Sequence, residues 1–250
     1  MPSATTADNS DSTAPSIAIV KACTTNAFIC ARETCGITGW GSDALIPPKR
    51  LPIVSTGKWK SRVATVATIK AIKIIQEFNG ESGCNRYIIS QCNSALNVLE
   101  VYGLFLLCGW RQDIMNIDIV PLFETVDDLQ HAADVMKTLY SNKVYGNHLA
   151  MRNKHQTIML GFSDGTKDGG YRMANCRIYK AKEELTAISK EYGVEVIFFD
   201  GRGGPPSRGG GKTHKFYASM GRNISNKEIQ LTVQGQTVSS NFGTVDAAQF

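Results

Sequence analysis

Short apolar runs alternate with longer helical patterns after residue 80, and this alternation limits the possible folds more than any other feature of the sequence. Continuously apolar strands separated by helices are typical of parallel βαβ units, whose strands are buried on both faces. Four of the runs are clear, and a fifth is shorter. The predicted strands are 86–90, 117–123, 157–162, 194–199 and 229–233.

Helices are predicted before the first strand and between the later ones. The clearest pattern precedes the first strand, where apolar residues recur at intervals of three and Asn79-Gly80 provides a stop signal. The predicted helices are 58–78, 96–107, 126–139 and 171–192. The ordered domain is expected to span 58–250. We expect residues 1–15, rich in Ser, Thr, Asp and Ala, to be a disordered tail, and 16–57, broken by glycines and prolines, to be an irregular segment of unclear origin.

Polar or charged residues follow every predicted strand, among them Glu124, Asp164 and Arg202. A barrel or an open α/β sheet gathers the carboxyl ends of its strands on one face, and that face holds the ligand. Five strands are too few to close an eight-stranded barrel. The predicted fold is therefore α/β, a partial (β/α) TIM-type barrel that is incomplete in this chain, with an open sheet as the alternative.

The segment 201–211 contains six glycines and two arginines, Arg202 and Arg208, and Lys212 follows it. Glycines let backbone N–H groups approach a ligand, and arginines match phosphate or carboxylate oxygens. An anion-binding loop is favoured over a flexible linker, since linkers combine glycine with serine. A nucleotide-binding P-loop is excluded, because Pro206 stands where that motif requires its first glycine.

Glu124 and Asp164 are candidate ligands for Mg²⁺ or Mn²⁺, which prefer carboxylate oxygens and keep several waters. Each acid could instead be a helix cap or a charge in a first helical turn, and spacing alone does not decide between these interpretations. Lys167, three residues after Asp164, could contact an anionic substrate or pair with that acid.

Composition argues against several other classes of protein. The net charge of +5 is only mildly basic, and no block of five Lys or Arg and no zinc-finger or RNA-binding signature accompanies it, so no nucleic-acid partner is expected. The seven cysteines include no C-x-x-C pair, which favours free thiols in a reducing compartment. No apolar run is long enough to span a bilayer, and a cytoplasmic protein is expected. His131, His148 and His155 are expected at the surface, while His214 follows the glycine-rich segment.

Three segments together resemble the signatures of phosphoenolpyruvate carboxylases, in the right order. These are 120–129 (VPLFETVDDL), 158–170 (IMLGFSDGTKDGG) and 198–214, whose FFDGRGGPP wording is similar to a bacterial-type subgroup. The resemblance runs from about residue 70 to residue 250. It implies carboxylation of phosphoenolpyruvate with bicarbonate, giving oxaloacetate and phosphate, an anaplerotic step that feeds the tricarboxylic acid cycle.

The resemblance also implies roles for individual residues. Glu124 and Asp164 fall on the family's two metal ligands, for Mg²⁺ or Mn²⁺. Lys167 falls on a lysine near the substrate, and Arg202 on an arginine that holds phosphate or carboxyphosphate. Arg208 falls on an arginine of a mobile loop that closes over the site. The implied substrate-binding positions are Gly203, Gly204 and Gln234. Full-length members of the family form homotetramers.

Several positions depart from the family pattern. Many members have a histidine where this chain has Asp200, and none of the four histidines here precedes a proline, as the family's proton-carrying histidine does. Family enzymes are also several times longer. Three hypotheses follow: a fragment of the enzyme, a non-catalytic remnant that binds Mg²⁺ and phosphoenolpyruvate, or an anion-binding interaction module. We expect the isolated chain to be inactive.

Overall fold

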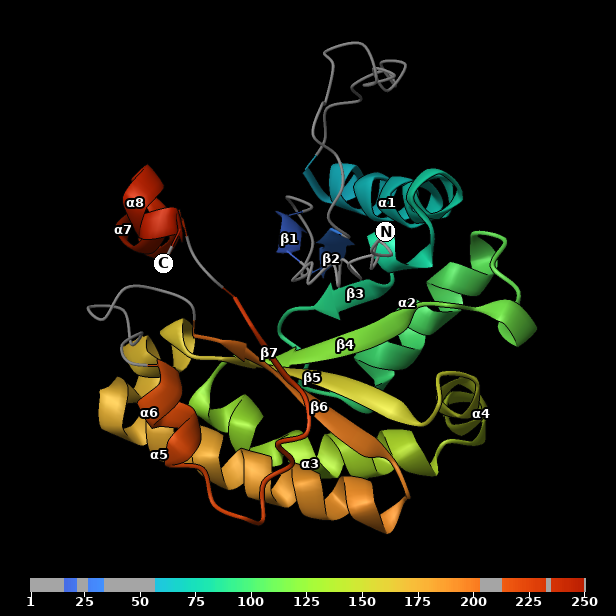
Figure 1. Cartoon of the computed structure of the whole chain (residues 1–250). Helices are drawn as coiled ribbons and strands as arrows, with labels where there is room; N and C mark the ends of the chain where they lie inside the picture. The colour runs from blue at the N-terminus through green and yellow to red at the C-terminus, as the bar shows by residue number, and fades with distance from the viewer. Residues whose placement is uncertain (1–15, 22–26, 34–56, 203–212, 233–234, 250) are drawn as a thin grey trace, which may run out of the picture.

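The computed structural model describes residues 16–21, 27–33, 57–202, 213–232 and 235–249. A seven-stranded sheet with strand order β1 to β7 crosses the molecule (Figure 1). Its last five strands are parallel neighbours in chain order. They are β3 (Arg86–Ile89), β4 (Asp118–Phe123), β5 (His155–Gly161), β6 (Glu195–Gly201) and β7 (Ile229–Leu231). The predicted partial barrel is confirmed, and the described part of the sheet does not close.

Two further strands extend the sheet at the edge beside β3. These strands, β1 (Ser16–Lys21) and β2 (Ala27–Glu33), are antiparallel to each other, and β2 is antiparallel to β3. They lie within 16–57, where the sequence suggested loops. The rest of that segment and the tail 1–15 lie outside the described residues.

Helices alternate with the parallel strands as predicted. The helices that cover the sheet or flank it are α1 (Gly57–Asn79), α2 (Ala95–Leu107), α3 (Val126–Ser141), α4 (Lys143–Met151) and α5 (Ser163–Glu191). Capping fixes several of their starts, because the side chains of Ser94, Thr125 and Asn142 accept hydrogen bonds from the first-turn N–H groups of α2, α3 and α4. No helix in the described part of the chain has the length and apolar character needed to cross a membrane.

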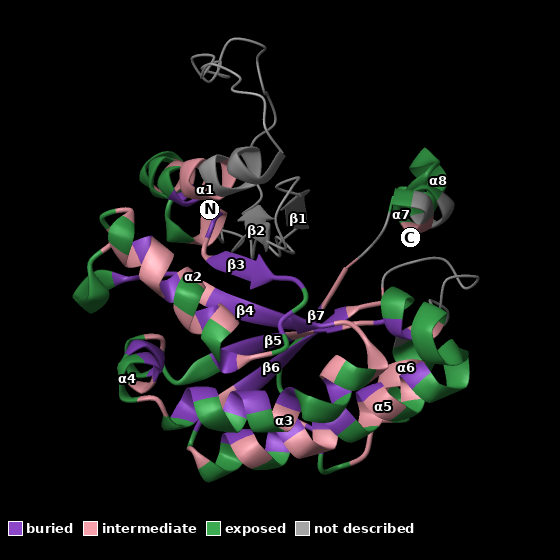
Figure 2. Cartoon of the chain, turned by 180° about the vertical axis from the view of Figure 1, so that it is seen from behind, coloured by how far each residue is buried: buried purple, intermediate pink, exposed green. Residues whose placement is uncertain are grey.

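Three short helices follow β6. They are α6 (Thr213–Ala218), α7 (Gly235–Phe242) and α8 (Val245–Gln249), and α7 and α8 lie apart from the helix layer (Figure 1). The parallel strands are the most buried part of the chain, whereas the helices expose their outer faces (Figure 2).

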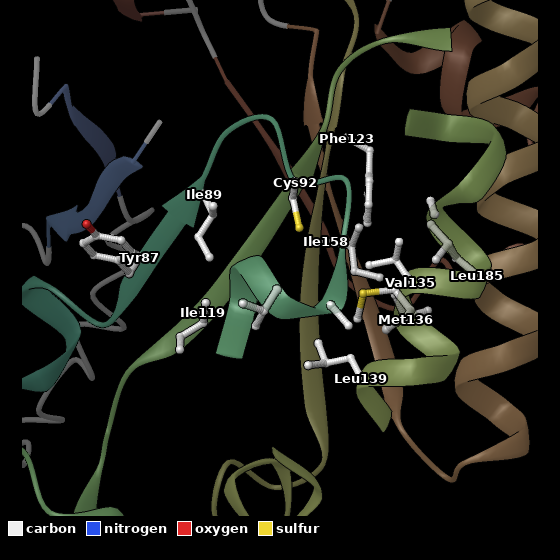
Figure 3. Close-up of a cluster of buried hydrophobic side chains, with 14 of the residues drawn as sticks. Tyr87, Ile89, Cys92, Ile119, Phe123, Val135, Met136, Leu139, Ile158 and Leu185 are labelled. Carbon is white, nitrogen blue, oxygen red and sulfur yellow. The ribbon is translucent and has the colours of Figure 1, made fainter. Parts of the chain in front are cut away.

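The core has two parts because successive side chains of a strand point to opposite faces of the sheet. The larger part fills the space between the sheet and its helices, where Phe123 and Ile158 from the strands meet Met136 and Leu185 from α3 and α5 (Figure 3). The smaller part lies on the other face. Its members are Ile88, Val120, Leu122 and Phe199, with Met159 packed against them. A buried apolar set on both faces explains why these strands have continuous apolar sequences.

Candidate functional site

The carboxyl ends of β4, β5 and β6 lie side by side in register. Phe123 pairs with Leu160, and Gly161 pairs with Gly201, so Glu124 and Arg202 follow the ends of β4 and β6, the two strands that flank β5. Gly161 allows a close approach here, since a Cβ atom at this position would lie 3.0 Å from the Cα atom of Glu124. The register therefore brings the predicted acids and Arg202 to one edge of the sheet.

Glu124 and Asp164 form an acidic pair at this edge. Burial raises the pKa of the Glu124 carboxyl. The negative charges of Asp164 and Asp128 raise it further, as does a hydrogen bond with Asp164, while the charge of Lys167 lowers it. Asp164 lies in the first turn of α5, as the capping alternative anticipated, and its Oδ1 accepts a 2.8 Å hydrogen bond from Nζ of Lys167. The first-turn interpretation of Asp164 is confirmed, while its role as a metal ligand stays a prediction.

Local hydrogen bonds hold the acidic edge in place. Asp128 accepts from the backbone N–H groups of Thr125, at 3.1 Å, and of Glu124, at 3.4 Å. Asp168 of α5 accepts from the N–H of Val126 at 3.2 Å, which ties the start of α3 to the start of α5. These contacts use acids that the sequence did not assign, and they fix the backbone on which Glu124 is mounted.

Arg202 lies against aromatic rings where β6 ends. The carbon atom of its guanidinium is 3.9 Å from the ring centroid of Phe216 on α6 and 5.0 Å from that of Phe162. Nη1 also donates a long hydrogen bond of 3.5 Å to the side chain of Asn175. Stacking of this kind limits the orientations of the arginine plane, which suits recognition of a planar or tetrahedral oxyanion.

Asp200, two residues before Arg202 in the chain, forms a buried ion pair with Lys182. Nζ of Lys182 on α5 is 2.8 Å from both carboxylate oxygens of Asp200, and the hydroxyl of Tyr217 donates a 2.8 Å hydrogen bond to Oδ2 of that carboxylate. Burial lowers the pKa of Lys182, which Asp200 partly offsets. Burial and the charge of Asp200 raise the pKa of Tyr217. The sequence did not predict this cluster. The only signal in the sequence was the position of Lys182, four residues after Ile178 on the helix face that is buried.

Several predicted residues lie outside the described part of the chain. They are Arg208, Gly203, Gly204 and Gln234. His214 is exposed on α6. The expectation for His148 was wrong, since this side chain is buried with 1% exposure on α4, packed against the rings of Tyr102 and Tyr145.

The acidic pair is a small ligand set. The described residues contain no group of three or more His, Cys, Asp or Glu side chains that could hold a metal ion. Two carboxylates still suit Mg²⁺, which dehydrates reluctantly and is often bound by one or two carboxylates together with substrate oxygens. Burial is the largest cause of the raised pKa of Glu124, and the negative charge of Asp164 adds to it, so a divalent cation would relieve the repulsion between the two acids.

The family model for phosphoenolpyruvate carboxylase matches residues 46–250, which include all the parallel strands and every residue of the site described above. The match begins before the point where the three sequence motifs start, and it includes α1.

Proposed function

The chain belongs to the phosphoenolpyruvate carboxylase family, and from this membership we propose that its parallel strand ends form the metal- and phosphate-binding side of a carboxylation site. The substrates would be phosphoenolpyruvate and bicarbonate, and the products oxaloacetate and phosphate. The observation that carries the proposal is that Glu124, Asp164 and Arg202 follow the carboxyl ends of β4, β5 and β6, three strands that pair side by side.

Glu124 and Asp164 are the residues that would hold Mg²⁺ or Mn²⁺. When bound, the cation would supply positive charge next to the oxygen on which negative charge develops as the phosphoryl group leaves. Lys167 now pairs with Asp164 at the surface, where the two side chains are 74% and 50% exposed. An exposed pair of this kind is weak, so Lys167 can exchange its partner for an anionic substrate at little cost.

Arg202 would bind the phosphoryl oxygens. Its guanidinium carries a permanent charge and several donors, and the rings of Phe162 and Phe216 limit its orientation. The cation on one side and Arg202 on the other would then bracket a substrate that carries both a phosphate and a carboxylate. This arrangement favours a phosphorylated carboxylic acid over a simple phosphate ester.

The proposal is tested by binding of phosphoenolpyruvate to the chain with and without Mg²⁺, measured by calorimetry. We expect Mg²⁺ to tighten binding to the wild-type chain and to have at most a small effect on Glu124→Gln, which keeps the size of the side chain but loses its charge. Asp134→Asn is the matched control, because Asp134 is an exposed acid on α3. Equal Mg²⁺ enhancement in Glu124→Gln and the wild type would refute the assignment of this acid.

A second arm of the same experiment separates the alternative functions. A non-catalytic remnant would bind phosphoenolpyruvate in the presence of Mg²⁺ without turnover. An anion-binding interaction module would bind inorganic phosphate and phosphoenolpyruvate equally well, without any requirement for Mg²⁺.

A further inference from the structure

The cluster of Lys182, Asp200 and Tyr217 joins three elements of the fold at one point. Lys182 comes from α5, Asp200 from the end of β6 and Tyr217 from α6. The side chains of Lys182 and Asp200 are only 3% and 4% exposed. Removing two charges from water is costly and is tolerated only when the pair is well formed and its remaining hydrogen bonds are satisfied. Tyr217 provides the additional hydrogen bond to the carboxylate.

Asp200 does not face the candidate ligand. Its oxygens are engaged by Lys182 and Tyr217, and the residue as a whole is 3% exposed. A group so enclosed cannot exchange a proton with a substrate or coordinate one. Its contribution must therefore pass through neighbouring residues.

The neighbour that links the cluster to the site is Phe216, next to Tyr217 on α6. The ring centroid of Phe216 is 5.4 Å from Nζ of Lys182 and 3.9 Å from the guanidinium carbon of Arg202. One ring thus contacts both the buried cation and the cation at the site. Because α6 has only six residues, its position depends on such contacts more than on its own helical stability.

We propose that Lys182, Asp200 and Tyr217 are positioning residues for Arg202. The buried ion pair accepts the Tyr217 hydrogen bond and fixes α6, and α6 then holds the Phe216 ring against the guanidinium. The inference rests on the proposed function only in assigning an oxyanion to Arg202. It gives Asp200 a structural role in orienting the anion-binding arginine, in a position where many family members have a histidine.

Tyr217→Phe is the sharpest perturbation, since it removes one hydroxyl and keeps the ring. The matched control is Tyr192→Phe, which removes a hydroxyl that also makes a 2.8 Å hydrogen bond, to Ser141, far along α5 from the site. Both variants should retain the helical content of the wild type by circular dichroism. Both substitutions remove a hydroxyl that makes a 2.8 Å hydrogen bond, but only that of Tyr217 bonds the buried carboxylate beside Arg202.

The first readout is the Arg202 Nε–Hε signal in a ¹H–¹⁵N correlation spectrum, assigned by its loss in Arg202→Lys. Stacking on Phe216 should give this signal a ring-current shift, which we expect to shrink in Tyr217→Phe and to persist in Tyr192→Phe. An unchanged Arg202 signal in Tyr217→Phe would overturn the proposal. This readout needs no ligand, so it tests the positioning role even if the proposed function fails.

The second readout is the dissociation constant for phosphoenolpyruvate with Mg²⁺. We expect about a fivefold increase for Tyr217→Phe, which is about 1 kcal/mol. This is less than the full value of a hydrogen bond to a charged group, because the substitution acts on the ligand only through Arg202. For Tyr192→Phe we expect less than about a twofold change. A shifted Arg202 signal with unchanged affinity would refute the role in binding. Absence of binding by the wild type would refute the proposed function and leave the spectrum to decide on the positioning role.

Discussion

His148 makes the stability of the chain depend on pH in a way that can be worked out from its surroundings. It lies on α4 with 1% exposure and contacts the rings of Tyr102 and Tyr145. Burial lowers the pKa of the imidazole to about 4, with a smaller contribution from Arg152, while Asp118 and a hydrogen bond to the backbone of Ile117 oppose the shift. The folded chain therefore holds this histidine neutral at physiological pH.

The sign and size of the effect follow from proton linkage. The unfolded chain binds a proton at His148 near its ordinary pKa of 6.5, whereas the folded chain does so only near 4. Acidification through this interval therefore favours the unfolded state, and the contribution is fully lost only below the folded pKa. Between about pH 7.5 and about pH 5, these two pKa values give a loss of about 2 kcal/mol in the free energy of unfolding.

Urea denaturation followed by circular dichroism at several pH values measures this loss, and His148→Phe provides the reference. Phenylalanine fills a similar volume but does not titrate. Glu124 shifts stability in the opposite direction, since its raised pKa makes the folded chain the better proton acceptor. That contribution is common to both proteins and cancels in their difference. If the wild type and His148→Phe lost the same stability between these pH values, the assignment to His148 would be refuted.

Two further predictions concern the site and the activity. Gly161→Ala would place a Cβ atom 3.0 Å from the Cα atom of Glu124. We expect the free energy of unfolding, measured by urea denaturation, to fall by roughly 1–3 kcal/mol and Mg²⁺-dependent binding to weaken. Gly103→Ala is the control and should be neutral or stabilising, because a Cβ atom there has nothing within 4 Å. The chain alone should show no carboxylase turnover in a coupled oxaloacetate assay, because none of its histidines precedes a proline as the family's proton carrier does. Turnover that depends on Mg²⁺ and bicarbonate would contradict this expectation.

Most of the parallel strands could be predicted because they are largely apolar on both faces and are bounded by polar residues. The helix α4 could not, although Tyr145, His148 and Leu149 follow helical spacing and Asn142 caps it. The helix has only nine residues, and one of its three buried positions is a histidine. Sequence reasoning places a histidine at the surface.

The start of α5 was also missed, because residues 161–170 contain four glycines and suggest a loop. The helix begins at Ser163 and changes direction at Gly170, whose φ is 79°. Gly165 explains the tolerance for glycine in its first turns, since a Cβ atom there would lie 3.2 Å from the carbonyl oxygen of Glu124. A small residue favours this close packing, and the contact becomes visible only in the three-dimensional structure.

Site residues that directly follow a predicted strand could be assigned from the sequence. Contacts between residues far apart in the chain could not. Glu124, Asp164 and Arg202 each follow an apolar strand, so their common location followed from the topology of a parallel sheet. Lys182 and Asp200 are separated by 18 residues and meet only because α5 packs back along β6. The role of Asp200 was therefore left open by the sequence.

The ion pair changes the electrostatics expected at the end of β6. An uncompensated carboxylate two residues before Arg202 would oppose the binding of an anion there. Lys182 compensates that charge within a buried contact, and the proximity of Arg202 contributes to the lowered pKa of Lys182. The three groups together keep a net positive charge at the same end of the sheet as the acidic pair of Glu124 and Asp164. A substrate with two anionic ends, one directed to a cation held by the acids and one to Arg202, satisfies both charges at once, which a neutral ligand does not.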